Sequence, residues 1–152
     1  MTDVRPDAGM HVLLVDDSPG DVRLTREAFR DAGAAITLHV AADGVEAIAF
    51  LERADANGLA PRPDLILLDL NLPRMDGREV LARIKSDPAL RTIPTVILTT
   101  SGAPADVARC YELQANCYLI KPVQLDRFES LVESVNDFWL TKARLPQQPD
   151  PG

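Results

Sequence analysis

The stretch LLVDDSPGD, residues 13–21, decides the fold because it joins an apolar run directly to two adjacent carboxylates and then to Ser-Pro-Gly. A proline at this point suits the first turn of a helix, so the stretch predicts a buried strand, a short turn and a helix. Asp16 and Asp17 carry like charges at the end of the buried strand, where charge is costly unless something neutralises it. The stretch therefore also predicts a bound cation.

Short apolar runs recur along the chain, and they lie at residues 11–15, 36–41, 65–70, 95–100 and 117–120. They are continuously apolar rather than alternating, which is typical of parallel strands covered by helices on both faces. Segments with helical spacing separate them, and the clearest helix pattern covers residues 125–139. The sequence therefore predicts an α/β fold, a doubly wound five-stranded parallel sheet with helices on both faces.

The length of 152 residues, of which 46% are hydrophobic, suits one domain with a full core. We expect this folded domain to cover residues 10–140. The preceding residues 1–9 are expected to be flexible. The C-terminal residues end in LPQQPDPG, which lacks apolar periodicity, so we expect an extended tail over residues 141–152.

Composition excludes several classes of partner. The net charge is -7 and the 16 Lys and Arg residues are scattered, which argues against direct nucleic-acid binding. No apolar stretch approaches the roughly 18 residues that cross a bilayer, and the N-terminus does not resemble a secretion signal. The two cysteines have no zinc-type or disulfide-type spacing. These features together predict a cytoplasmic protein without a membrane partner.

Polar side chains follow four of the predicted strands. Asp16 and Asp17 follow the first strand and Asp69 lies at the end of the third, while Thr99 and Lys121 end the fourth and fifth. The carboxyl ends of parallel strands meet at one edge of a sheet, so we expect these side chains to converge. Carboxylate oxygens without His or Cys favour Mg²⁺. With a lysine and a hydroxyl nearby, such a site suits phosphoryl transfer to a carboxylate.

The chain resembles the receiver domain of two-component response regulators. The residues that carry the resemblance are VDDSP, the stretch DLNLPRMDG at residues 69–77, Thr99 in LTTS, and Lys121 followed by Pro122. The resemblance covers residues 10–139, and the combination in this order is specific although each piece alone is weak. It implies the flavodoxin-like strand order 2-1-3-4-5.

The resemblance also implies a role for each of these residues. Asp69 would accept a phosphoryl group from a sensor histidine kinase, while Thr99 and Lys121 would hold the phosphoryl oxygens. It implies Mg²⁺ as the cofactor, bound by Asp16 largely through water, by Asp17 and Asp69, and by the backbone carbonyl of Asn71. A protein of this kind accepts phosphate and dephosphorylates itself slowly, and is not a turnover enzyme.

In receiver domains the hydroxyl at the position of Thr99 moves together with an aromatic residue of the fifth strand, which is Tyr118 here. The resemblance therefore implies a switch formed by Thr99 and Tyr118. Its output surface would be the face made by the fourth helix, the fifth strand and the fifth helix. The alternative for Tyr118 is that its ring only packs against the edge of the core.

The stretch SVNDFWLTKARLP, residues 134–146, resembles the C-terminal part of the single-domain regulators of bacterial phytochrome histidine kinases. This implies a kinase of the phytochrome type and a homodimer, with Phe138 and Trp139 as candidate interface residues. Two alternatives stay open. The two aromatic residues could instead cap the core of their own chain, and the protein could be a standalone receiver for another kinase.

Three other functions compete with this interpretation. Phosphatases of the haloacid-dehalogenase type also form an aspartyl phosphate, but they carry an Asp two residues after the nucleophile, where this chain has Asn71. A flavodoxin-type binding module would need a glycine- and hydroxyl-rich phosphate loop, and Asp16 and Asp17 would repel an anionic cofactor. A degenerate receiver used as a scaffold would not need Thr99 and Lys121 together with the acids.

Overall fold

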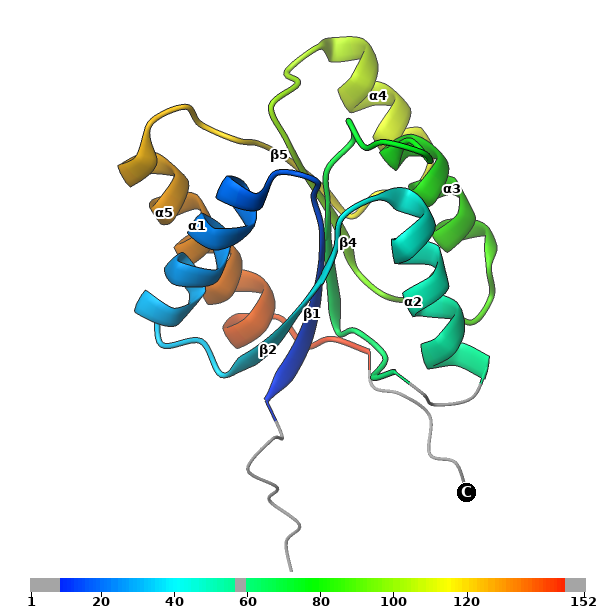
Figure 1. The fold of residues 1–152 in the computed structure, drawn as a ribbon, viewed down its shortest axis with the longest axis horizontal. Coiled ribbons are helices and arrows are strands. Elements are labelled where there is room, and N and C mark those ends of the chain that lie inside the picture. Colours follow the sequence, from blue (N-terminus) through cyan, green and yellow to red (C-terminus); the bar gives the residue numbers. More distant parts are fainter. Residues whose placement is uncertain (1–8, 57–59, 147–152) are drawn as a thin grey trace, which may run out of the picture.

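The computed structural model describes residues 9–56 and 60–146, and Figure 1 shows a central sheet between two layers of helices. The sheet contains five strands: β1 (Met10–Val15), β2 (Ile36–Ala41), β3 (Leu65–Leu68), β4 (Thr95–Thr99) and β5 (Cys117–Ile120). All neighbouring strands pair in parallel. Their order is β2-β1-β3-β4-β5, which confirms the predicted doubly wound, flavodoxin-like sheet.

Five α-helices connect and cover the strands: α1 (Pro19–Asp31), α2 (Gly44–Ala56), α3 (Gly77–Ser86), α4 (Pro104–Glu112) and α5 (Leu125–Val135). In Figure 1, α1 and α5 lie on one side of the sheet and α2, α3 and α4 lie on the other. This arrangement is the one expected when right-handed crossovers connect parallel strands.

The central strand β3 explains why the core has two halves. All four of its residues are fully buried. Leu65 and Leu67 belong to the half that contains Phe29 of α1, whereas Ile66 and Leu68 belong to the half under α2 and α3. Each such side chain contributes about 1.5–3 kcal/mol when it is fully removed from water. The continuous apolarity of the strand therefore follows from burial on both faces.

The turn between β1 and α1 has the form that the opening stretch predicts. Ser18 is the N-cap of α1, and its Oγ accepts a hydrogen bond from the backbone N–H of Asp21 at 3.2 Å. Pro19 occupies the first helical position, where its missing N–H has no helical partner to lose. This cap brings the first turn of α1 directly beside the end of β1.

The helical backbone continues two residues past residue 140, where the sequence analysis places the end of the domain and the start of the extended tail. The domain boundary itself stays a prediction. After α5 the helical backbone continues as a π-helical segment, Asn136–Lys142, so the extended chain begins only at Ala143. Trp139 and Leu140 pack partly buried against the core under α1 and α5, and Thr141 Oγ1 donates to the Asn136 carbonyl at 3.0 Å. These contacts hold the wider turns. The expectation of flexibility at residues 1–9 lies outside the described residues, except at Gly9.

Two strands end earlier than their apolar runs. β3 ends at Leu68 and β4 at Thr99, so Asp69 already lies beyond the sheet.

Over the described ranges, the helices are all too short or too polar to cross a bilayer.

Candidate functional site at the carboxyl edge of the sheet

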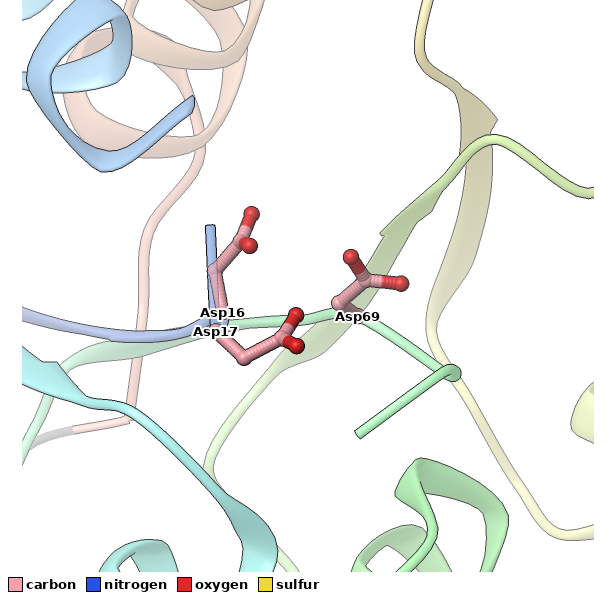
Figure 2. A group of neighbouring side chains, drawn as sticks. All are labelled: Asp16, Asp17 and Asp69. Atoms are coloured by element: carbon pink, nitrogen blue, oxygen red, sulfur yellow. The ribbon is translucent and has the colours of Figure 1, made fainter. Parts of the chain in front are cut away.

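Three carboxylates meet where β1 and β3 end. Asp16 and Asp17 follow β1, Asp69 follows the neighbouring β3, and one oxygen from each lies within 4.8 Å of the other two. Figure 2 shows the three side chains leaving the ends of these adjacent strands. Asp16 and Asp69 are buried, with exposed fractions of 2% and 9%, whereas Asp17 is exposed. Hard divalent cations prefer oxygen donors of this kind, so the cluster suits such an ion.

The ammonium group of Lys121 lies among these acids. Its side chain is only 4% exposed, and Nζ donates to Asp16 Oδ2 at 2.7 Å and to Asp69 Oδ2 at 2.9 Å. The third hydrogen bond, also of 2.9 Å, goes to Asp21 Oδ2. An ammonium group has three N–H donors, so three carboxylates satisfy it completely.

Sequence reasoning missed Asp21. The signal was present, because Asp21 lies in the first turn of α1 and three residues after the N-cap Ser18, on the helix that starts at the edge of the site. An acid in the first turn of a helix is generally favoured by the helix dipole, so its position alone does not indicate a role in a site. With Asp21 included, the site holds four carboxylates and one ammonium group, and three of the carboxylates contact that ammonium directly. The formal charge of the site is then -3, more negative than the sequence predicted.

Burial and charge pairing shift the pKa values here in opposite senses. Burial raises the pKa of Asp16, although hydrogen bonds from Lys121 and from the Ser18 backbone oppose the shift. Burial alone would lower the pKa of Lys121, but the hydrogen-bonded carboxylates of Asp16 and Asp69 outweigh it and raise that pKa. Lys121 therefore stays charged and partly neutralises the acids.

Thr99, the last residue of β4, is fully buried, and its Oγ1 has no hydrogen-bond partner among the described residues. The backbone N–H of Lys121 donates to the Thr99 carbonyl at 2.7 Å, which fixes the ends of β4 and β5 at the same level. A buried hydroxyl without a partner is uncommon and costs about 1–3 kcal/mol. Thr99 thus retains an unused donor at the edge where the acids lie.

The loop after β3 folds back onto the backbone of Asp69. The backbone N–H of Asn71 donates to Asp69 Oδ1 at 3.3 Å, and that of Gly77 donates to the Leu70 carbonyl at 2.9 Å. A Cβ at position 77 would lie 2.2 Å from the Asp69 carbonyl oxygen, so only glycine fits there. These contacts keep Asn71 beside Asp69, and the role of the Asn71 carbonyl stays a prediction.

Tyr118 of β5 packs partly buried against the core under α2 and α3, and its hydroxyl donates to the Ser101 carbonyl at 2.8 Å. Burial raises the pKa of this phenol. Ser101 Oγ donates to Asp106 Oδ2 at 2.6 Å, and Arg78 Nη2 donates to Asp106 Oδ1 at 2.7 Å. A polar chain that the sequence did not predict therefore connects Tyr118 to α4 and α3.

The two aromatic residues after α5 have different surroundings. Phe138 and Trp139 contact each other edge to face, with ring centroids 5.3 Å apart and planes at 88°. Trp139 also packs against the core under α1 and α5, as the alternative in the sequence analysis allowed. Phe138 is 55% exposed. Of the two, only Phe138 presents most of its side chain to the outside in the described chain.

Known proteins are similar to this chain in both sequence and structure. The family described as response regulator receiver domain matches residues 12–133. Response regulator Rcp1 of Synechocystis sp. is 47% identical over 135 residues, which cover 89% of this chain and 92% of that protein. The probable methanogenesis regulatory protein FilR2 of Methanothrix harundinacea is 38% identical over 135 residues, covering 89% of this chain and 86% of FilR2.

Solved structures of response regulators are also similar to this chain. The Mn²⁺-bound form of Rcp1 has a TM-score of 0.85 and 46% identity, covering 91% of this chain and 99% of that one. The phosphorylated cyanobacterial phytochrome response regulator RcpA has a TM-score of 0.87 and 44% identity, covering 92% and 100%. The resemblance seen in the sequence is thereby confirmed, and the chain belongs to the response regulator receiver domain family.

Proposed function

We propose that this protein is a response regulator that accepts a phosphoryl group on Asp69 from a sensor histidine kinase of the phytochrome type. The observation that carries the proposal is the position of Asp69, which is buried beside the Lys121 ammonium at 2.9 Å. It lies at the same sheet edge as the Thr99 hydroxyl, which has no partner among residues 9–56 and 60–146. The similarity to RcpA, which is described as a cyanobacterial phytochrome response regulator, supports the phytochrome pairing. A standalone receiver for another kinase is the alternative within the same family.

In the proposed reaction, an oxygen of the Asp69 carboxylate attacks the phosphorus of a phosphohistidine. The new O–P bond forms as the N–P bond breaks, and the electron pair returns to the imidazole of the donor. The Lys121 ammonium and the Thr99 hydroxyl then donate to two of the phosphoryl oxygens. Asp16, Asp17, Asp69 and the Asn71 carbonyl would hold Mg²⁺, which when bound neutralises negative charge on the phosphoryl group.

The acyl phosphate should hydrolyse slowly, because the chain lacks the acid that a turnover phosphatase of the haloacid-dehalogenase type carries. Asn71 occupies that position and has no acidic proton to give to a leaving group. The protein would therefore work as a phosphorylation-dependent switch in the cytoplasm and not as an enzyme with a substrate of its own.

The proposed signal passes from Thr99 to Tyr118. A phosphoryl group on Asp69 gives the Thr99 hydroxyl an acceptor, and a shift of Thr99 would strain the following residues up to Ser101, whose carbonyl binds Tyr118. The output surface would be the face of α4, β5 and α5. Exposed apolar side chains on it include Tyr111, Ile120 and Leu125. We propose a homodimer, with Phe138 as the better interface candidate and Trp139 supporting it, and no direct nucleic-acid partner.

The test is to incubate the wild-type protein and Asp69→Asn with acetyl phosphate, with and without Mg²⁺, and to read intact mass and oligomeric size together. Asp31→Asn, an exposed acid at the other end of α1, is the matched control. One phosphoryl group on the wild type and the control, none on Asp69→Asn and none without metal is the expected result. Modification at another residue, or modification that does not need Mg²⁺, would contradict the proposal.

The kinase is tested separately with two autophosphorylated donors, a bacterial phytochrome kinase and a histidine kinase without a phytochrome module. Faster transfer to Asp69 from the phytochrome kinase is expected. Equal rates would leave the receiver function intact and remove the phytochrome pairing.

A further inference from the structure

Asp21 belongs to the acidic edge, yet the proposed function gives it no role. Its carboxylate accepts a 2.9 Å hydrogen bond from Lys121, while its own side chain is 34% exposed. Surface ion pairs contribute little, but the partner here is an ammonium group that is only 4% exposed. Asp21 therefore contacts a buried group from the rim of the site.

The backbone around Asp21 is fixed at both ends. Its N–H donates to the N-cap Ser18 Oγ at 3.2 Å, and its carbonyl accepts from Thr25 Oγ1 at 2.7 Å, with Thr25 fully buried at 1% exposure. The first turn of a helix also favours a carboxylate through the helix dipole. The direction of the Asp21 side chain toward Lys121 is thus set by the start of α1 and not by a mobile loop.

The three partners of Lys121 are not equivalent. Asp16 and Asp69 both belong to the cluster whose oxygens lie close enough together to hold a metal ion, and Asp21 does not. Asp69 also receives the phosphoryl group in the proposed function. A cation held by Asp16 and a phosphoryl group on Asp69 would draw both carboxylates into other contacts. Asp21 is then the carboxylate that stays available to the ammonium.

We infer that Asp21 is a positioning residue that holds the Lys121 ammonium beside Asp69, where it binds the incoming phosphoryl oxygen. This inference rests on the proposed function. A carboxylate acting only as a charge would repel the anionic phosphoryl donor and slow the reaction. A carboxylate that positions Lys121 accelerates the reaction instead. Removing the charge of Asp21 therefore distinguishes the two roles by the sign of the effect.

The first measurement is the rate of phosphorylation by acetyl phosphate at saturating Mg²⁺. Asp21→Asn keeps the shape of the side chain and removes its charge, and we expect a decrease on the order of tenfold, as for the loss of one charged hydrogen bond. Glu27→Gln is the matched control, because it removes an exposed charge from the same helix. Asp21→Glu, which restores a carboxylate on a longer side chain, should recover most of the rate.

The second measurement tests whether the effect passes through Lys121. The affinity for beryllofluoride, a phosphoryl mimic, should fall in Asp21→Asn. The same substitution should have no further effect in a Lys121→Gln background, measured at a temperature at which circular dichroism shows that this background is folded. The ¹⁵N signal of the Lys121 ammonium should be resolved in the wild type and broadened in Asp21→Asn, which loses one charged acceptor of its three N–H groups.

A faster reaction in Asp21→Asn, or an equal decrease with and without Lys121, would overturn the inference. If the wild type were not modified on Asp69 at all, the proposed function would fail and this inference with it. A normally modified wild type with an unaffected Asp21→Asn would remove the role of Asp21 alone.

Discussion

Thr95 and Thr99 occupy the two ends of β4 and are both fully buried, yet their hydroxyl groups differ. Thr95 Oγ1 donates to the Ile93 carbonyl at 3.1 Å, whereas Thr99 Oγ1 has no partner in the described part of the chain. The Thr95 hydroxyl stabilises the fold through this hydrogen bond. The Thr99 hydroxyl destabilises the fold, a cost that is consistent with its proposed binding of a phosphoryl oxygen.

Substituting valine at each position should therefore have effects of opposite sign. Thr99→Val removes a buried hydroxyl that lacks a partner among the residues that the structure describes, so we expect the free energy of unfolding to rise by about 1 kcal/mol. Thr95→Val removes a hydrogen-bonded hydroxyl, and the free energy of unfolding should fall by about 1 kcal/mol. Urea unfolding without phosphoryl donor measures both. A decrease in both variants would contradict this view of Thr99.

The start of α4 is tied to α3 by Asp106. The pKa of this carboxyl is lowered, first by the hydrogen bond from Ser101 and then by Arg78. A carboxyl whose pKa is lower in the folded than in the unfolded state stabilises the folded protein at pH values above the unfolded-state pKa. This stabilisation is lost as the pH falls through the folded-state pKa. Asp106→Asn should therefore be less stable than the wild type at pH 7, and the difference in melting temperature should shrink below about pH 4. Glu112→Gln, which removes an exposed carboxylate at the other end of α4, is the control for the loss of one negative charge at pH 7.

Two glycines near helix starts should respond differently to alanine. At Gly77, the first residue of α3, an added Cβ would meet the Asp69 carbonyl oxygen at 2.2 Å, so Gly77→Ala should destabilise the fold by about 1–3 kcal/mol. At Gly20 in α1 the nearest atom would lie 3.9 Å away, so Gly20→Ala should stabilise by up to about 1 kcal/mol. Thermal unfolding of the two variants checks the prediction, and similar losses in both would refute it.

At the scale of the elements, hydrophobic pattern predicted each strand and helix but not every boundary. Apolar residues continue past Leu68 because Leu70 is buried too, although it no longer pairs in the sheet. The π-helical turn after α5 was missed because helix periodicity carries no information on how Trp139 and Leu140 settle against the core. Side-chain packing determines where these strands and helices end, and the packing cannot be read directly from a single sequence.

The molecule as a whole carries a net charge of -7, and much of it meets at one edge of the sheet. Ligand binding to the folded state alone stabilises it by mass action, by about 2.7 kcal/mol at a hundredfold excess over Kd. Mg²⁺ should therefore raise the melting temperature of the wild type and of Asp31→Asn. Asp17→Asn should lose most of this increase.

The control for this Mg²⁺ experiment is NaCl at the same ionic strength, which screens charge without binding between Asp16, Asp17 and Asp69. If NaCl raised the melting temperature as much as Mg²⁺ does, general screening and not metal binding would explain the effect.

Topology explains why so much of the site was predictable. Once the strands are parallel, the residues after each strand must share an edge, so Asp16, Asp17, Asp69, Thr99 and Lys121 could be grouped from their positions alone. Asp21 could not be placed in the same way, because it comes from a helix whose rotation depends on the Ser18 cap and on Thr25. The same holds for Ser101, Asp106 and Arg78, which meet only through side-chain conformations.

Lys121 supplies the acidic edge with a counter-ion that is part of the chain itself. This counter-ion partly neutralises the buried carboxylates of Asp16 and Asp69 without any bound metal. A chain lacking this lysine would leave Asp16 and Asp69 buried without their partner, a state that is strongly destabilising. In a living cell such a variant would be depleted by proteases, so its loss of signalling would reflect scarcity of the protein as well as defective chemistry.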